Sequence, residues 1–314
     1  MLRLVKSELY KLRLSKYTWI IGGSLLIISL FYAIILSFNS TDVENANWRE
    51  QIQNQIQSDQ ETIATLHPVV PMYSFLKEQI AINQYRLEVD LPPNTEFNVW
   101  TLLIEIGPII SIIGLISIIH AATSVSSEFT RGTIKIISTS SNKRWKILTS
   151  KFFTLMILLT TLLFSVVALN TLIGYIFLGT DGGNYYLTYQ NGEVQELGVV
   201  KYLLLNFSGA WFNILLIASL AFMISALFRN NVIAIGFSLL IYFTGTAITN
   251  FLALHSDWVK FTLLANSDLT QYLDGSTTIA SMSIEFSVVV NLIYLVIFLL
   301  ISLISFTKRD IKTA

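Results

Sequence analysis

Long apolar runs dominate the pattern of hydrophobic and polar positions along this chain. Six of them are about long enough to cross a hydrocarbon core of ~30 Å as an α-helix. They lie at Tyr17–Phe38, Trp100–Ala122, Phe152–Leu178, Leu203–Phe228, Val232–Leu254 and Phe286–Phe306. The pattern therefore predicts an all-α integral membrane protein in which six transmembrane helices form a single domain over residues 1–314.

The first sixteen residues carry a different pattern. Leu2, Val5, Leu9 and Leu12 recur at helical spacing, with Lys and Arg between them. Such a stripe is typical of a basic amphipathic helix that lies in a membrane interface. Residues 1–16 are therefore predicted to form an interfacial helix; the alternative is a solvated terminus whose cations only set the orientation.

Two segments between the apolar runs have structure of their own. In the segment 39–99, apolar residues recur at helical spacing from Trp48 to Leu66, prolines break the pattern, and a second helical stretch follows over about 72–88. We expect these two helices to form an extracytoplasmic cap; the alternative is a flexible polar loop. The segment 179–200 is rich in Gly, Tyr and Asn and predicts a turn or short hairpin.

Composition and charge fix the environment and the orientation. Only 13% of the residues are charged, against about 25% in soluble domains. There are no cysteines, which excludes disulfides and thiol chemistry. The net charge is zero, yet 15 Lys and Arg fall on the face that holds both termini and 5 on the other. The positive-inside rule then places both termini in the cytoplasm, and the composition is compatible with a bacterial plasma membrane.

Candidate chemistry is sparse. The chain has no GxxxxGK[ST], GxSxG or HExxH pattern, and His67, His120 and His255 are far apart. We therefore expect no enzyme activity, no catalytic or metal site and no bound cofactor, and nothing points to nucleic acid. Glu105 is the sole carboxylate well within a predicted span, which makes it a candidate for a transport path. Pro108 predicts a kink in the same helix.

A charged segment, 123–151, connects the second and third apolar runs. Ser126 and Ser127 before Glu128 predict the start of a short helix. A polar break follows at 138–142, and residues 143–151 are predicted to form a basic juxtamembrane helix that leads into the third span. This arrangement predicts a docking projection for a cytoplasmic partner; the alternative is a plain loop whose cations only set orientation.

This segment resembles the loop between the second and third spans of ABC-2 type ABC transporter permeases. In that family the loop reads approximately E-x-x-x-G-T, then a polar break, then R-x-x-I/L-x-x-x-K. The matching residues here are Glu128, Gly132, Thr133, Arg144, Ile147 or Leu148, and Lys151. The family often has a proline in the break, where this chain has Ser140, Ser141 and Asn142. The basic N-terminal helix and the C-terminal Phe306–Ile311 also look like the ends of that family.

The resemblance implies a mechanism and a set of partners. Two permease chains, identical or different, would pair around a path, and two copies of a separate ATP-binding subunit, using ATP and Mg, would dock beneath them. The loop would be the coupling helix that seats in the ATPase. The residues that the resemblance assigns to coupling are Glu128, Phe129, Arg131, Gly132, Thr133, Arg144 and Lys151.

Two hypotheses of function follow. The first is an export permease that moves an amphipathic or hydrophobic compound, such as an antimicrobial peptide, a drug or a lipid, and so contributes to antibiotic resistance. Spans rich in Ile, Leu and Phe suit such cargo better than a hydrophilic ion. The alternative is a membrane sensor or immunity protein that binds an antimicrobial at its outer loop without transport. A stand-alone secondary transporter is disfavoured by the scarcity of charge within the spans.

Overall fold

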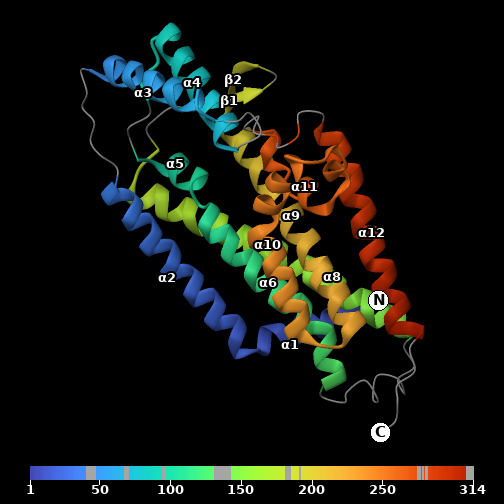
Figure 1. The fold of residues 1–314 in the computed structure, drawn as a ribbon. Coiled ribbons are helices and arrows are strands. Elements are labelled where there is room, and N and C mark those ends of the chain that lie inside the picture. Colours follow the sequence, from blue (N-terminus) through green and yellow to red (C-terminus); the bar gives the residue numbers. More distant parts are fainter. Residues whose placement is uncertain are drawn as a thin grey trace.

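A computed structural model describes the chain except for residues 40–46, 67–70, 94–96, 131–142, 181–184, 191, 274–276, 278, 280–281 and 309–314. Its long helices form an elongated bundle (Figure 1). Helix α1 (Leu2–Leu14) lies across one end, which we term the basic end. A small layer of helices α3 (Trp48–Ile63) and α4 (Pro71–Val89) covers the other, which we term the capped end.

Six helical segments of the described chain are long and apolar enough to cross a membrane. They are α2 (Lys16–Asn39), α5 with α6 (Val99–Ile104 and Gly107–Thr130), α8 (Arg144–Phe177), α9 (Val199–Phe228), α10 (Asn231–Ala253) and α12 (Ile284–Lys308). Each coincides with one of the six apolar runs in the sequence, so the prediction of a six-span, all-α membrane protein is confirmed. Helix α6 extends about two turns beyond its predicted span toward the basic end, and α8 begins at Arg144, which confirms the juxtamembrane helix predicted over residues 143–151.

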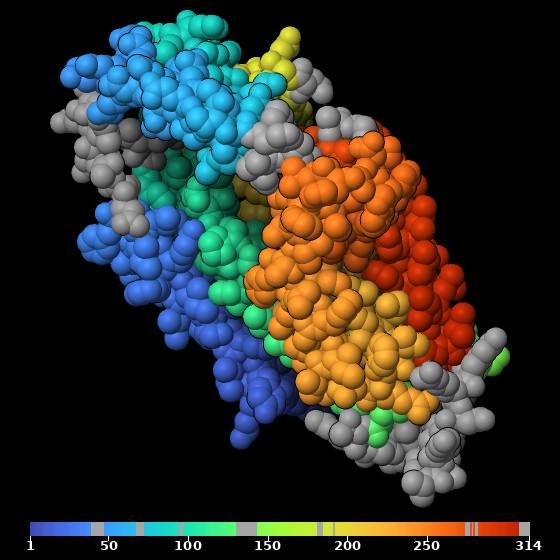
Figure 2. Space-filling view, viewed as in Figure 1, coloured from blue at the N-terminus to red at the C-terminus, as the bar shows by residue number. Residues whose placement is uncertain are grey.

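The core of the bundle is centred on α9, which contacts α6, α10 and α12. In the most apolar 18-residue stretch of α9, 67% is buried, whereas in the corresponding stretch of α2 only 17% is buried. Helices α2 and α12 form the flanks of the molecule in Figure 2 and expose large apolar side chains such as Phe31 and Ile293. Apolar surface on this scale is not stable in water, which agrees with the character of a membrane protein.

The second span is divided near the capped end. Helix α5 ends at Ile104, with Glu105 as its C-cap, and α6 begins at Gly107. Pro108 therefore lies in the first turn of α6, where its missing N–H costs nothing. The Tyr32 hydroxyl of α2 donates to the Glu105 carbonyl at 2.7 Å. The predicted kink is therefore a complete break, and a side chain from the neighbouring helix satisfies a carbonyl at the break.

The predicted helix start at Ser126 is wrong. Helix α6 continues without interruption through Ser126 and Glu128 to Thr130. The hydroxyl of Ser126 donates back to the carbonyl of Ala122 at 2.8 Å, a bond that serine makes inside helices. Capping residues and helix-interior serines look alike in sequence, and the local pattern did not separate them.

At the capped end, α3 packs on α4, and α4 contacts a β-hairpin. Strands β1 (Tyr185–Gln190) and β2 (Glu193–Gly198) pair antiparallel, which confirms the predicted hairpin as the one sheet among the described residues. The hydroxyl of Tyr85 on α4 donates to Glu196 at 3.0 Å, and this bond is the main reason that the pKa of Tyr85 is raised. Strand β2 runs directly into α9, so the cap is joined to the central helix.

A compact polar segment connects α10 to α12 at the same end. It contains η1 (Asp257–Phe261), α11 (Leu263–Asn266) and η2 (Thr270–Tyr272). The fully buried Asn266 accepts from Ser287 of α12 at 2.7 Å and donates to the Lys260 carbonyl at 2.6 Å. The side chain of Gln190 in β1 donates to the carbonyls of Tyr272 and Leu273 at 3.3 Å. The hairpin therefore also contacts the segment before α12.

Candidate functional site

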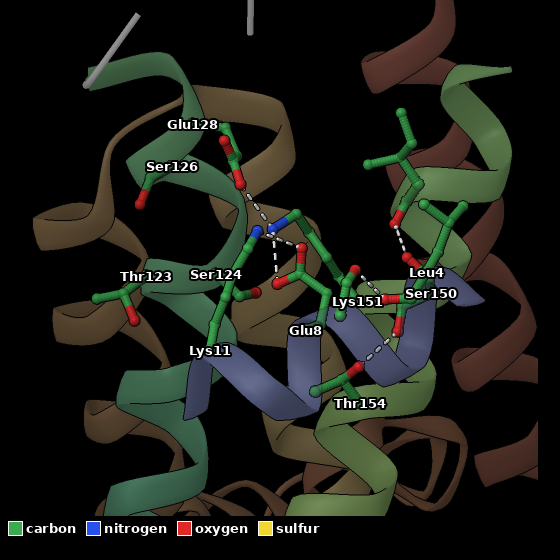
Figure 3. Close-up of polar contacts among 12 residues, drawn as sticks. Leu4, Glu8, Lys11, Thr123, Ser124, Ser126, Glu128, Ser150, Lys151 and Thr154 are labelled. Carbon is green, nitrogen blue, oxygen red and sulfur yellow. Dashed lines mark hydrogen bonds and ion pairs between the residues drawn. The ribbon is translucent and has the colours of Figure 1, made fainter. Parts of the chain in front are cut away.

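Four charged side chains join α1, α6 and α8 at the basic end (Figure 3). The ammonium of Lys151 on α8 lies 2.8 Å from Glu128 Oε1 on α6 and 3.4 Å from Glu8 Oε2 on α1. Glu8 also accepts from Lys11 at 2.9 Å. We term these four residues the ion cluster. Two cations alternate with two carboxylates, so their formal charges cancel.

The ion cluster is largely closed to solvent. The side chain of Lys151 is 4% exposed, that of Glu128 13% and that of Glu8 20%. A buried ammonium costs several kcal/mol unless opposite charges and hydrogen bonds replace its water. The ion pairs therefore fix the relative positions of three helices that come from distant parts of the chain.

Helical periodicity explains why these residues meet. Ile147, Lys151 and Leu155 are four residues apart and share the buried face of α8. On α1, Val5 is buried and Glu8 follows three residues later on the same face. The packing of apolar neighbours thus carries a lysine and a glutamate into the interface, where they pair.

A second contact group lies at the last turn of α6, one residue beyond Glu128. The guanidinium of Arg229 lies 4.6 Å above the ring of Phe129, and the edge of Phe306 contacts the same ring at 5.9 Å between centroids. Arg229 ends α9 in the left-handed conformation, with φ 56°. This conformation is uncommon for a residue with a Cβ. The stack joins the ends of α6, α9 and α12.

Hydroxyl groups reinforce this junction. The hydroxyl of Ser225 on α9 donates to the Ala122 carbonyl of α6 and accepts from the Ser126 amide at 3.1 Å. Ser305 on α12 donates to the Ala226 carbonyl at 3.1 Å. Movement of the end of α6 is therefore opposed by direct bonds to α9, and α9 is bonded in turn to α12.

Two of the three histidines, His120 and His255, lie in the described part of the chain, in different segments. His120 lies on α6 within electrostatic range of Lys151 and Glu8. His255 is exposed at the capped end, and His67 lies outside the described residues. Within the described part of the chain, no group of three His, Cys, Asp or Glu side chains could hold a metal ion.

The structure brings together some of the residues assigned from sequence and separates others. Glu128, Phe129 and Lys151 meet at the basic end, and Arg144 is the first residue of α8. Arg131, Gly132 and Thr133 lie outside the described residues. Glu105 is exposed at the α5–α6 break near the capped end, most of a helix length from the ion cluster.

Two functional candidates were missed by the sequence analysis. Glu8 was grouped with the basic stretch, although it is the only acidic residue among the first sixteen. Arg229 was counted only as a charge that sets orientation. In both cases the signal was a residue unlike its neighbours: Glu8 is the one acid in a basic helix, and Arg229 is the one cation in the short turn between α9 and α10.

The fold defines a multi-pass α-helical membrane protein, and the ion cluster joins helices α1, α6 and α8 at one end of it. The chain belongs to the family described as "Protein of unknown function (DUF2705)", which matches residues 62–312. Glu128, Lys151 and Arg229 fall inside the matched range, whereas Glu8 precedes it.

The chain is also similar to two proteins from Bacillus subtilis (strain 168). The chain is 36% identical over 314 residues to "Uncharacterized protein YhcI", with 99% of both chains covered. It is 29% identical over 199 residues to "Uncharacterized membrane protein YdbK", which covers 63% of this chain and 77% of the relative. The second name agrees with the membrane character of the fold.

Proposed function

We propose that this chain is the transmembrane permease subunit of an ATP-driven exporter of the ABC-2 type in a bacterial plasma membrane. The basic end faces the cytoplasm, with both termini, and α3 and α4 form an extracytoplasmic cap. Two copies of a separate ATP-binding subunit dock at the basic end and hydrolyse ATP with Mg. A second permease chain, identical or different, completes the transport path.

One observation carries the proposal. Lys151 of α8 pairs with Glu128 of α6 at 2.8 Å, and these two residues lie at the two ends of the segment that resembles a coupling loop. A force applied to a loop moves a membrane domain only if the loop is anchored to rigid elements. Here the same buried ion pair anchors both ends of the loop.

The contacts above the loop give the force a route into the bundle. Glu128 and Phe129 are consecutive residues of α6; the first is tied to α8 and α1, and the second to Arg229 and Phe306. A displacement produced by closure of the ATPase dimer is therefore transmitted to five helices as a rigid-body shift. Packed helices transmit such shifts because their interiors are close-packed and of low compressibility.

The cargo is an amphipathic or hydrophobic compound. The described spans present mainly apolar side chains, and Glu105, the carboxylate at the α5–α6 break, is exposed beneath the cap. The cap contacts α9 through the hairpin, so a compound that binds at the cap is in mechanical contact with the helix at the core of the bundle. Glu105 is placed at the outer part of the transport path in this proposal.

The test begins with purification of the complex. The full chain is purified in mild detergent from its native membranes. A soluble protein with a Walker A motif should co-purify with it, at one copy for each permease chain. Reconstituted together, the two should export an amphipathic antimicrobial peptide at the expense of ATP. In the variant Glu128→Gln, we expect ATP hydrolysis to persist while peptide export per ATP hydrolysed falls. The expected decrease is roughly 5- to 150-fold, the factor that corresponds to typical coupling free energies between two sites.

Lys77→Gln is the matched control, because Lys77 is exposed on α4 at the capped end, far from the ion cluster. It should leave the export per ATP unchanged. Peptide movement by the isolated chain without an ATPase would contradict the proposal. If deletion of residues 48–88 abolished protection from the peptide while loss of the ATPase did not, the sensor hypothesis would replace it.

A further inference from the structure

The outward face of α1 is built differently from the face that packs on α8. Val5 is buried against the bundle, and the hydroxyl of Thr149 on α8 donates to the sulfur of Met1 at 3.8 Å. The outward positions are exposed on the described chain; they are Leu2, Arg3, Lys6, Ser7, Tyr10, Lys11, Arg13 and Leu14. One side of α1 is therefore exposed along the whole length of the helix.

The fold removes the negative charge from this face. Glu8, the single acidic residue among the first sixteen, is turned inward and paired with Lys151. Arg3, Lys6 and Arg13 remain on the outward side, with Lys11 at its border. The outward face of α1 therefore carries cations and no carboxylate, although the sequence of the helix contains one.

Large apolar side chains are interleaved with these cations. Leu2, Tyr10 and Leu14 are 85%, 62% and 65% exposed. Immediately after the corner between α1 and α2, Tyr17 and Trp19 are 78% and 74% exposed. Water does not favour such apolar exposure, and a hydrocarbon core does not accept the cations. The headgroup layer of a bilayer accommodates both, since long basic side chains reach the phosphates while apolar groups enter the acyl boundary.

The corner holds the surface in a fixed orientation. The hydroxyl of Thr18 donates to the Leu12 carbonyl at 2.6 Å, and the indole N–H of Trp19 donates to the Arg13 carbonyl at 3.2 Å. Both bonds are made to carbonyls in the last turn of α1, and the Leu12 carbonyl also accepts from the Ser15 backbone N–H at 3.1 Å. Together with the Glu8–Lys151 pair, they set α1 across the bundle in Figure 1 rather than in line with α2.

We propose that the outward face of α1 is a binding surface for anionic phospholipids, with the phosphates held by Arg3, Lys6 and Arg13 and the acyl boundary contacted by Leu2, Tyr10 and Leu14. The first turn of α8 extends this surface beside Met1, because Trp145 there is 45% exposed and carries the Lys146 ammonium 5.7 Å from its ring. The inference does not depend on an ATPase. It assigns to α1 a lipid preference, whereas the positive-inside rule requires only that its cations stay on one side.

The absence of cysteine from the chain allows a clean experiment. A fluorophore attached to Ser7→Cys, at an exposed position of α1, reports on neighbouring lipids when the purified chain is placed in nanodiscs. Brominated phosphatidylglycerol should quench it at a much lower mole fraction than brominated phosphatidylcholine. The substitution Arg3→Gln/Lys6→Gln/Arg13→Gln should reduce this preference by a factor on the order of 100, since each cation near an anionic surface contributes about fivefold.

Two further variants serve as controls for the effect of charge and of position. Arg3→Lys/Arg13→Lys keeps the charges and should keep the preference. Lys77→Gln/Lys201→Gln removes two exposed cations at the capped end and should also keep it. Equal quenching by the two lipids, or a preference that survives removal of the three cations, would overturn the proposal. So would restored fluorescence on addition of inorganic phosphate, which would indicate a soluble anion as the ligand.

The same variants separate a lipid surface from a protein contact. If the wild-type chain shows no lipid preference and the loss of Arg3, Lys6 and Arg13 instead releases an ATP-binding subunit, the face is a subunit contact and the lipid proposal fails. If the lipid preference is found but no ATPase co-purifies, the lipid surface stands and the proposed export function fails. The two conclusions can therefore be tested independently.

Discussion

Replacing Lys151 with methionine is expected to lower the free energy of unfolding by about 3–5 kcal/mol, the range found when one partner of a buried ion pair is removed. Methionine fills a similar volume but carries no charge. Glu128 then loses its ammonium at 2.8 Å, and Glu8 loses its ammonium at 3.4 Å. Both carboxylates lie in a largely closed site where water replaces that charge poorly, and α1 loses an ion pair that ties it to the bundle.

The measurement is unfolding of the purified chain by transfer from mild detergent into sodium dodecyl sulfate. Lys143→Met is the matched control, because Lys143 is exposed immediately before α8, and the change should be within about 0.5 kcal/mol. The triple substitution Glu8→Gln/Glu128→Gln/Lys151→Met removes all three buried charges and should recover most of the loss. If Lys151→Met were as stable as Lys143→Met, the ion cluster would not be what positions α1.

The six spans could be predicted from sequence because each is an almost unbroken apolar run. In a bilayer such a run has few alternatives to a helix, since every backbone group must be bonded internally. The β-hairpin could also be predicted, because Gly and Asn punctuate a short run of Tyr. The start of α8 could be predicted as a basic helix before the third span, but the end of α6 could not, because its polar last turns lie outside the apolar run and have no hydropathy signal.

The ion cluster needed tertiary structure. Lys151 and Glu128 were assigned from a family resemblance, but nothing in the sequence places them within 2.8 Å of each other. Glu8 is 143 residues from Lys151 along the chain, and its role depends on α1 lying across α8. Local periodicity shows which face of each helix is buried, but it does not show which buried faces meet. Arg229 was missed for the same reason, because its partner Phe129 belongs to another helix.

At the capped end, Gly174→Leu is expected to lower the free energy of unfolding by about 3 kcal/mol, at the upper end of the usual cost of overpacking. A Cβ on Gly174 would lie 2.7 Å from Val99 Cγ2 and 2.9 Å from Val99 Cα. The second of these atoms belongs to the backbone, so no change of rotamer relieves the clash. Helix α8 carries this glycine where the first residue of α5 crosses it, so any side chain pushes α5 away.

Two variants separate this close approach from the general effect of placing a side chain on a helical glycine. Gly22→Ala on α2, where no atom beyond the adjacent residues and the helix's own backbone lies within 4 Å of the new Cβ, should be neutral or more stable by at most about 1 kcal/mol. Val99→Ala should only partly rescue Gly174→Ala in the unfolding assay, because it removes Cγ2 but leaves the backbone of residue 99 against the new methyl group. Full rescue, or a Gly174→Leu variant as stable as the wild type, would show that α5 does not depend on close backbone packing against α8. Partial rescue would show that the absence of a side chain at residue 174 is what allows the start of α5 to pack against α8.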